Sequence, residues 1–402
     1  MYSTMIPMSI DLPADVPFAF RLQDLAVRLA TLLDQRDPRG VRYPLSAMLM
    51  IAIVAKLAGY HRVEALADWA RLRAPDLVFL FGLARPTMPH ARTWGRIFAQ
   101  AVDPVALDAV LGQFFQELQT SAEVPERGSI VLAVDGKTLR GTIPLGQTQG
   151  MHLVAAYLPE TGVVLAQLAV ENHTNEIRVV PQVLESLNLT GVVVTGDALQ
   201  TQRPVSTQIV EAGGDYLWFV KANQPQLHAD LVQLFTPLPT LPGTADDPLD
   251  FTTAATIDAA HGRLEERRIT VSSLLQDYSG WPYLAQAFKL ERWVTDGVGR
   301  QTYEVRYGIS SLPALMADAE RLLVVARAAW GIENGLHYRR DVTLQEDANQ
   351  LRRGWAPHVL ATLNNTVVSL AAQHGWDNLA KAQREFAYCW DRAFAQRMVQ
   401  RR

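Results

Sequence analysis

Cysteine, long apolar runs and an excess of positive charge are scarce or absent in this chain of 402 residues. Cys389 is the single cysteine, which excludes a disulfide framework and a cysteine-based zinc site and fits a reducing cytoplasm. The longest apolar stretch, residues 43–59, contains Lys56 and is shorter than a membrane span requires, so we expect a buried helix there. The start of the sequence shows no secretory signal. We therefore expect a cytoplasmic protein without membrane segments.

The net charge of −4 at pH 7 also lacks the basic excess that is common among nucleic-acid-binding proteins. The acidic excess falls on residues 128–312, whereas the flanking regions are neutral or slightly basic. Bound metal ions would offset part of this negative charge. The composition therefore does not exclude a nucleic-acid partner.

Periodicity divides the chain into four regions. Apolar residues recur at helical spacing from about 20 to 120, which predicts a helical N-terminal domain over 1–125. Short runs rich in Val, Leu and Ala then predict the first part of an α/β core over 126–235. A loop rich in Pro and Gly introduces strand-like segments, so we expect a mainly β insertion over 236–312. Helical spacing returns over 313–402.

The core region reads as three strands, then helix, strand, helix and strand. A Gly-containing turn in "YLPETGVV" predicts that the second and third strands form a hairpin. The later strands are continuously apolar, which is typical of a sheet covered by helices on both faces. We therefore predict an α/β fold.

Two aspartates directly follow apolar runs in this core. Asp135 and Asp197 are each expected at the end of a strand, where the carboxyl ends of strands in one sheet form a ligand-binding crevice. Glu333 lies in a helical pattern between Ile332 and Leu336, which would hold it against the core. Three carboxylates and no cysteine ligand suit Mg²⁺ or Mn²⁺, which prefer oxygen ligands. Two such ions can stabilise the attacking oxygen and the leaving oxygen of a phosphoryl transfer.

Each acid also has an ordinary structural interpretation. A single aspartate at the end of a strand, such as Asp135 or Asp197, is more often a turn or helix-cap residue than a metal ligand. A helical glutamate such as Glu333 is usually solvated or ion-paired at the surface. Glu346 and Asp347 are alternative third acids. Periodicity alone leaves these choices open.

The order of several segments adds a further indication, because together they span nearly the whole chain. The chain resembles the DDE transposases of bacterial insertion sequences, in the branch of H-repeat-associated proteins. The segments that carry this resemblance are "DPRGVRYPLSAMLMIAIVAKLAG", "AVDGKTLRGT", "HLVAAY", "NEI", "VVTGDALQTQ", "DYLWFVKANQPQL", "HGRLEERR", "WGIENGLHYRRDVTLQEDANQLRRG" and "LATLNN".

The resemblance implies a ribonuclease H-like core with a helical N-terminal domain, a mainly β insertion before the third acid, and a helical C-terminus. It assigns the catalytic and metal-binding triad to Asp135, Asp197 and Glu333. The implied reaction uses two Mg²⁺ or Mn²⁺ ions to cut transposon ends and join the 3′-hydroxyl to target DNA. Double-stranded DNA and a homodimer or higher homo-oligomer are the implied partners, and the helical domain would serve end binding or assembly.

Two other functions remain open from the sequence. A domesticated descendant would act as a metal-dependent DNA nuclease or recombination factor, and a further derivative would bind DNA without catalysis. The presence of all three acids favours an enzyme.

Several basic and amide residues near these motifs are candidates for contacts with DNA phosphates. Ion pairing, loop solvation or a solvated helix surface is the alternative explanation for each of them. The candidates are Lys137, Arg140, Lys221, Asn223, Gln224, Arg263, Arg327 and Arg340. His337 is expected to be an orienting or structural residue, since hard cations prefer oxygen.

Overall fold

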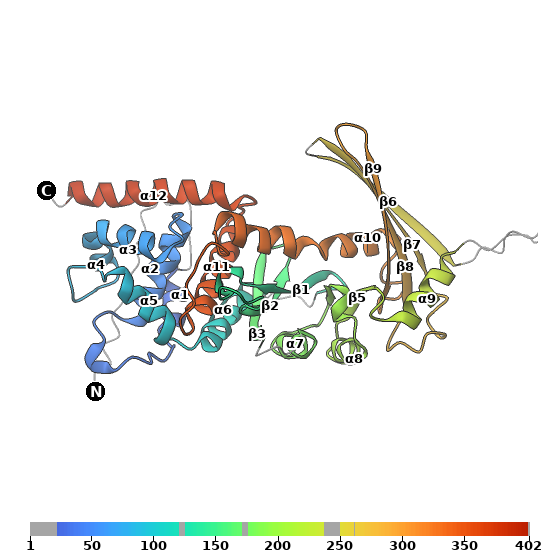
Figure 1. Cartoon of the computed structure of the whole chain (residues 1–402), viewed down its shortest axis with the longest axis horizontal. Helices are drawn as coiled ribbons and strands as arrows, with labels where there is room; N and C mark the ends of the chain where they lie inside the picture. Colours follow the sequence, from blue (N-terminus) through green and yellow to red (C-terminus); the bar gives the residue numbers. More distant parts are fainter. Residues whose placement is uncertain (1–21, 120–124, 171–175, 237–249, 261, 401–402) are drawn as a thin grey trace, which may run out of the picture.

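The computed structural model describes residues 22–119, 125–170, 176–236, 250–260 and 262–400. Helices form most of the region before the sheet, as the periodicity predicted (Figure 1). They are α1 (Leu22–Leu29), α2 (Leu45–Leu57), α3 (Val63–Leu72), α4 (Ala74–Leu80), α5 (Ala91–Gln100) and α6 (Pro104–Gln119). The apolar stretch around Lys56 is the buried helix α2, and within the described residues no helix is both long and apolar enough to cross a membrane.

The described strands form one nine-stranded sheet in the order β3-β2-β1-β4-β5-β9-β8-β7-β6. β1, β4 and β5 are parallel to one another, and the remaining neighbouring pairs are antiparallel. The strands are β1 (Ile130–Thr138), β2 (His152–Leu158), β3 (Val163–Val170), β4 (Val192–Gly196), β5 (Asp215–Val220), β6 (Phe251–Ala260), β7 (Arg263–Ser272), β8 (Gln286–Thr295) and β9 (Gln301–Ser310). The predicted α/β class and the hairpin of β2 and β3 are confirmed.

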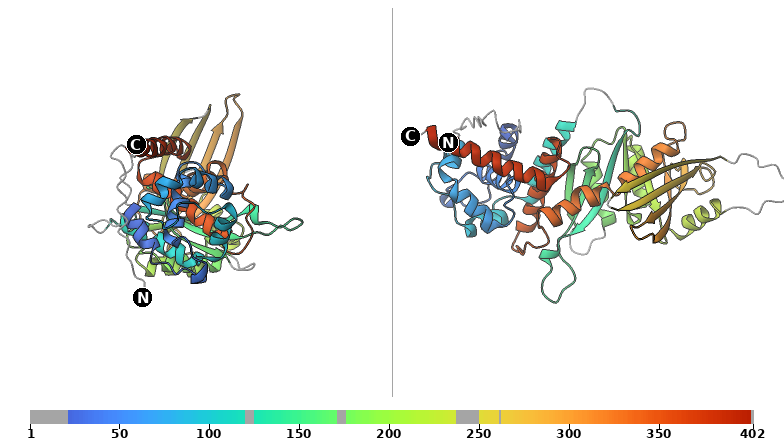
Figure 2. Two further views of the ribbon diagram at one scale, coloured as in Figure 1. Left: turned by 90° about the vertical axis from the view of Figure 1, so that its left-hand side faces the viewer. Right: turned by 90° about the horizontal axis from the view of Figure 1, so that it is seen from above.

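Helices cover both faces of the first five strands (Figure 1). α7 (Val180–Glu185) and α8 (Arg203–Glu211) lie on one face, and α10 (Ala319–Ala328) lies on the other. The remaining helices are α9 (Pro225–Leu234), α11 (Ala356–Gln373) and α12 (Leu379–Gln400). α12 runs along the N-terminal helices, as Figure 2 shows from above.

Side chains along β1 alternate between these two faces, because successive residues of a strand point in opposite directions. Leu132 and Val134 join the apolar cluster of α7 and α8. Val131 packs with α10, and Ala133 packs with the cluster that includes α11. Asp135 continues the second series, so its side chain lies on the α10 side of the sheet.

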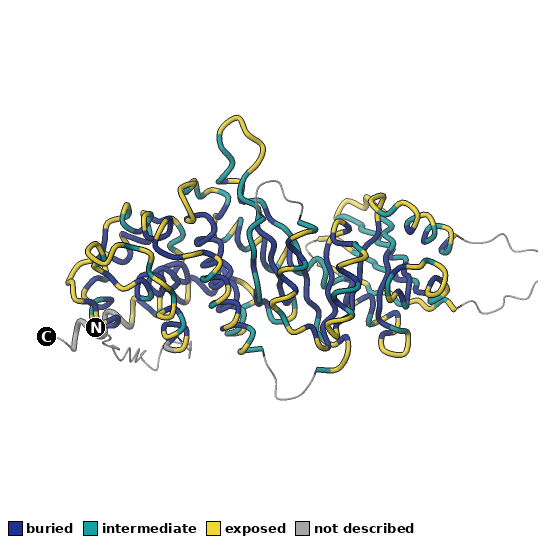
Figure 3. The backbone as a smooth tube through the Cα atoms, turned by 90° about the horizontal axis from the view of Figure 1, so that it is seen from below, coloured by how far each residue is buried: buried dark blue, intermediate teal, exposed yellow. Residues whose placement is uncertain are grey.

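One apolar cluster crosses the boundary predicted at residue 125. It contains residues of α2, α5 and α6 together with Ala133, Ala155 and Tyr157 of the sheet and residues of α11 and α12. Figure 3 shows the buried backbone running without interruption from the helical region into the sheet. The division into four domains stays a prediction, and the helices and the sheet share part of their core.

The strands expected in the insertion are confirmed, but they extend the core sheet. β9 pairs with β5, and β8, β7 and β6 follow outwards. The apolar face of this extension, with Ile269, Phe288 and Leu290, packs against α10. The insertion is therefore tied to the core by main-chain hydrogen bonds as well as by side-chain packing.

A glycine at this junction gives a test of that connection. Gly308 of β9 is buried, and a Cβ at this position would collide with the carbonyl oxygen of Trp218 and the ring of Phe288. We expect Gly308→Ala to lower the free energy of unfolding by about 1–3 kcal/mol, as overpacking does elsewhere. Urea denaturation measures the change.

The matched control is Gly95→Ala on α5, where a Cβ meets nothing within 4 Å. Since alanine favours a helix over glycine, this variant should gain about 0.5–1 kcal/mol. Equal stabilities for the two variants would contradict the close approach of β5 and β9.

Candidate functional site

Asp135 lies inside β1, which corrects the expectation that it ends the strand. Pairing with β2 continues past Asp135, opposite Ala155, as far as Thr138 opposite His152. The apolar run stops at Asp135, but the main-chain ladder does not depend on apolar side chains, so the strand extends beyond the run. The Asp135 side chain is 30% exposed, and the backbone N–H of Gly136 donates to its Oδ1 at 2.9 Å.

Glu333 enters the site from two π-helical turns that follow α10. These turns are η5 (Glu333–His337) and η6 (Arg339–Thr343). Ile332 and Leu336 are buried and anchor the turn, as predicted. Gly335 lets the turn approach the hydroxyl of Tyr157 on β2, where any Cβ would collide. This close approach brings Glu333 onto the sheet beside β1.

His337 joins the two acids. Its Nδ1 lies 3.2 Å from Oε2 of Glu333 and 3.5 Å from Oδ2 of Asp135. One potential ligand atom from each of the three residues lies within 4.8 Å of the others. His337 is buried, and its Nε2 has no hydrogen-bond partner among the described residues. Two carboxylates and an imidazole at this spacing fit a divalent cation.

The two carboxyl groups titrate differently because their surroundings differ. Burial raises the pKa of Asp135 to about 6, and the nearby charge of Glu176 acts in the same direction. The hydrogen bond from His337 lowers the pKa of Glu333, whose side chain is 65% exposed. Asp135 is therefore the acid whose ionised form is costly, and a cation would relieve that cost.

Binding of a cation at this site should depend on pH through Asp135. The pKa of Asp135 is about 6 in the folded chain and about 3.9 in an unfolded chain, so the protonated carboxyl favours the folded state. This stabilisation is fully present below about pH 4 and is lost as the pH rises through about 6. A cation requires the ionised carboxylate. We expect Mn²⁺ affinity to be constant above about pH 7 and to fall towards tenfold per unit below about pH 6.

Isothermal titration calorimetry across this range measures the Mn²⁺ affinity. Asp135→Asn, which cannot titrate, provides the control and should bind Mn²⁺ weakly at every pH. A wild-type affinity that does not change between about pH 5 and pH 7 would contradict a role for Asp135 as a ligand.

Asp197 lies at the end of β4 as predicted, next to Asp135 in the parallel pair. The register joins Val134 to Gly196, so the two aspartates occupy the next position on neighbouring strands. The Asp197 side chain is 60% exposed and pairs with Lys221 at 3.2 Å. It is not in the group formed by Asp135, Glu333 and His337. Its role as a ligand of the metal-binding triad stays a prediction.

A second polar cluster lies behind Gly136, on the opposite face of β1. His152 Nδ1 lies 2.8 Å from the Thr138 hydroxyl, and its Nε2 lies 2.7 Å from Oε1 of Glu176. Gln200 donates to Oε2 of Glu176 at 2.9 Å. Sequence reasoning missed this cluster, although "NEI", "HLVAAY" and "GDALQ" each contribute one member. The polar residue within each of these three motifs was the available signal.

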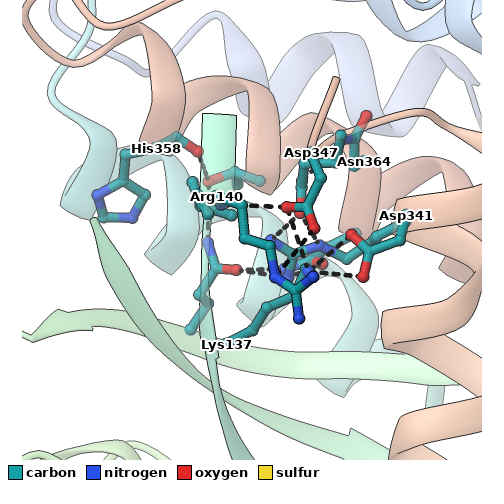
Figure 4. A network of polar contacts seen from close by, with 12 residues as sticks. Lys137, Arg140, Asp341, Asp347, His358 and Asn364 are labelled. Carbon is teal, nitrogen blue, oxygen red and sulfur yellow. Dashed lines mark hydrogen bonds and ion pairs between the residues drawn. The ribbon is translucent and has the colours of Figure 1, made fainter. Parts of the chain in front are cut away.

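The basic residues behind the first acid have different surroundings (Figure 4). Lys137 is buried, and its Nζ lies 2.6 Å from Oδ1 of Asp341 and 3.7 Å from Asp347. Lys137 is therefore an ion-paired residue, because its burial leaves it little access to DNA. Arg140 is 80% exposed and lies 3.7 Å from Asp347, so it remains available.

The residues that follow β5 stabilise the neighbouring loop. Asn223 donates to the carbonyl of Ala198 at 2.7 Å, and Gln224 donates to that of Thr201 at 2.9 Å. Lys221 remains 58% exposed beside Asp197. These contacts hold the end of β4 in place, whatever further contacts the residues make.

The other three arginine candidates differ in exposure and in ion pairing. Arg263 is exposed at the start of β7, and its neighbour His261 lies outside the described residues. Arg327 pairs with Asp258 at 2.8 Å. Arg340 is fully buried and cannot contact DNA, which corrects its predicted role. Helical spacing over 313–402 does not distinguish a π-helical turn, and such a turn changes which side chains share a face.

Arg340 belongs instead to a buried polar network beneath the site. Its Nε donates to Oε2 of Glu346 at 2.8 Å, and Asn364 donates to Oε1 of the same carboxylate at 2.8 Å. Burial alone would raise the pKa of Glu346, but the Arg340 charge and these hydrogen bonds lower it. Lys56 of α2 donates to Asn364 at 2.8 Å, and burial lowers its pKa to about 8. Glu346 is therefore a structural residue.

Two family models match the chain. The model described as "Transposase DDE domain" matches residues 126–370, which include the whole candidate site, and the model described as "DDE_Tnp_1-associated" matches residues 26–115. The matches therefore cover both the sheet and the helices that precede it.

Similar proteins have names in agreement with these models. "Putative transposase YncI" of Escherichia coli O157:H7 is 28% identical over 87% of this chain and 87% of its own length. "H repeat-associated putative transposase YhhI" of Escherichia coli strain K12 is 26% identical over 87% of this chain and 90% of its own. The cryo-EM structure of a piggyBac transposase synaptic complex with hairpin DNA covers 93% of this chain and 79% of that chain, with a TM-score of 0.45 and 10% identity.

Proposed function

Since this chain belongs to the family of the transposase DDE domain, a class of metal-dependent DNA-cutting enzymes, we propose that it cuts the ends of a mobile element and joins the freed 3′-hydroxyl to target DNA. The observation that carries the proposal is the meeting of Asp135 and Glu333 within 4.8 Å, because these residues lie far apart in the chain and only the fold brings them together.

We assign the core to the ribonuclease H-like class. The order β3-β2-β1-β4-β5 supports this assignment, because an antiparallel set of three strands is followed by two strands parallel to β1. Asp135 and Asp197 lie towards the carboxyl ends of β1 and β4. The extension β6–β9 lies between Asp197 and Glu333 in the chain, where the insertion is expected.

Asp135, Asp197 and Glu333 are proposed to hold two Mg²⁺ or Mn²⁺ ions. Asp197 directly follows β4, at the position that corresponds to Asp135 on the neighbouring strand β1. When bound, such ions supply an activated oxygen nucleophile and stabilise the leaving oxygen. His337 orients the carboxylate of Glu333 through Nδ1, and the buried Ile332 and Leu336 fix the turn that carries both residues.

The DNA partner follows from the family, and we propose that at least two copies of the chain act together because two element ends must be paired. Arg140, Lys221 and Arg263 are exposed and are proposed to contact the DNA backbone. The helical region before the sheet is proposed to help bind the element ends.

The experiment that tests this function supplies the purified chain with DNA carrying the inverted ends that flank its gene, a plasmid target and Mn²⁺. We expect strand cuts at the ends, products joined to the plasmid, and loss of both with a chelator. Cutting without joining would instead indicate a DNA nuclease. Binding without any metal-dependent cutting would overturn the proposal.

A further inference from the structure

A cavity of about 380 Å³ lies beside Glu333, between the end of α10 and the sheet extension. Four arginines contribute to its wall, three from the strands and one from α10, together with Trp330 and Glu333 itself. The arginines are Arg267 of β7, Arg292 of β8, Arg306 of β9 and Arg327 of α10. We call these four residues the arginine pocket. Glu333 thus lies between the candidate metal site and this cavity.

The pocket continues the apolar face that packs against α10. On β7, Arg267 lies two residues before the buried Ile269, and on β8, Arg292 lies two residues after the buried Leu290. Residues two apart on a strand share a face. The same face of the extension is therefore apolar over α10 and becomes basic where α10 ends beside Glu333.

Two of these arginines are direct cross-strand partners. The register pairs Arg267 with Arg292, an arrangement that destabilises a sheet because like charges lie opposite each other. The pKa of Arg267 is lowered, first by burial, and the charges of Arg327 and Arg292 act in the same direction. The fold therefore accepts an electrostatic cost at this position.

Acids of the sheet compensate only part of this charge. Glu265 lies 2.5 Å from Arg267 and also pairs with Arg292, while Asp258 pairs with Arg327 at 2.8 Å. Glu304 pairs with Arg306 at 2.6 Å. Together with Glu333 of the wall, these three acids give four carboxylates around the four guanidinium groups. The Nε of Arg267 is buried and has no hydrogen-bond partner among the described residues. The Nε–H donor of Arg267 thus remains for a ligand.

The orientation of one arginine is fixed in advance. The guanidinium of Arg306 lies 4.6 Å from the ring centroid of Trp330 and 6.0 Å from that of Phe219. A stacked guanidinium loses less conformational entropy when it binds an anion than a free one does. The four arginines present forked donors, which match the oxygens of a phosphate group.

We propose that the arginine pocket holds a backbone phosphate of the DNA strand next to the bond that is cut. The inference rests on the proposed function, which supplies the DNA strand. The binding site that it names includes residues of strands β7, β8 and β9. The volume of about 380 Å³ lies at the lower end of the range for small-ligand sites. A cavity of this size accommodates one phosphodiester with its sugar. Because Glu333 forms part of the wall, a phosphate bound there places the neighbouring linkage at the acids.

The test measures DNA binding without metal, so that it does not depend on cutting. Fluorescence anisotropy with a short labelled duplex of mixed sequence, in the presence of a chelator, gives the dissociation constant over a salt series. We expect Arg292→Gln and Arg327→Gln each to weaken binding about tenfold, the effect of losing one charge-assisted hydrogen bond. The slope of log affinity against log salt should fall by about 0.9 for each phosphate that the variant no longer neutralises.

Arg203→Gln is the matched control. Arg203 is an exposed arginine of α8, on the opposite face of the sheet, where it stacks on Trp281 and donates to the carbonyl of Gly280. Its variant should keep the wild-type affinity and slope. Arg292→Gln and Arg327→Gln lie on different elements, so one of them still reports on the pocket if the other fails to fold, and circular dichroism identifies folded variants.

The outcomes separate this inference from the proposed function. Wild-type affinity and slope in both folded pocket variants would overturn the inference alone. Absence of DNA binding by the wild-type chain would overturn both proposals.

Discussion

Asp135→Asn and Glu333→Gln should each reduce metal-dependent cutting of element-end DNA by more than about a hundredfold. Groups that only orient a metal ligand already contribute about 10–100-fold to affinity or activity, so loss of a ligand itself should cost more. Both changes remove a charge with almost no change in shape. Asp135 is half-buried near Glu176 and Glu333, so its neutral form relieves repulsion and should leave the fold intact. Rates of strand cutting in Mn²⁺ measure the effect.

Asp277→Asn is the matched control, because Asp277 is an exposed aspartate outside every strand and helix. It should cut at the wild-type rate. Asp197→Asn tests the third assignment separately, since this carboxylate pairs with Lys221 and lies outside the group around His337. A variant that retains cutting at the wild-type rate would remove its residue from the proposed metal site.

Arg340→Met should lower the free energy of unfolding by about 3–5 kcal/mol, the largest stability change that we expect from one substitution. The reason is the carboxylate of Glu346, which would remain buried without its charged partner. Equilibrium urea denaturation measures the loss. The exposed pair of Arg300 and Asp296 provides the control, and Arg300→Met should change stability little.

A double variant tests the physical reason for this effect. Arg340→Met combined with Glu346→Leu removes both charges and should recover much of the stability that Arg340→Met loses, because apolar side chains of similar size can replace a buried pair. The side-chain amide of Asn364 would still lose its acceptor on Glu346, so the recovery should be incomplete. A double variant as unstable as the sum of both single changes would show that the pair contributes through packing alone.

The elements of the core were predictable because each depends on a local pattern. Apolar runs located β1, β4 and β5, and the turn glycine located the hairpin of β2 and β3. The same patterns placed Asp135 and Asp197 on strands of one sheet, and the structure shows that these strands are neighbours. The end of β1 was not predictable, because the ladder to β2 continues through polar residues as far as Thr138.

The surroundings of the third acid needed the structure. Apolar spacing around Glu333 indicated a helix, but no pattern distinguished a π-helical turn, and this turn determines which side chains share a face. Arg340 was therefore placed at the surface when it is buried. The arginine pocket was likewise hidden, since Arg267 and Arg292 become neighbours only through the register of β7 and β8.

The core that α2, α5 and α6 share with the sheet means that the two matched family models do not mark separable pieces. A fragment beginning near residue 126 would expose Ala133, Ala155 and Tyr157, and it would leave Glu346 and Asn364 without Lys56. Such a fragment has no reason to fold alone. In the folded chain the two matched segments share one apolar core.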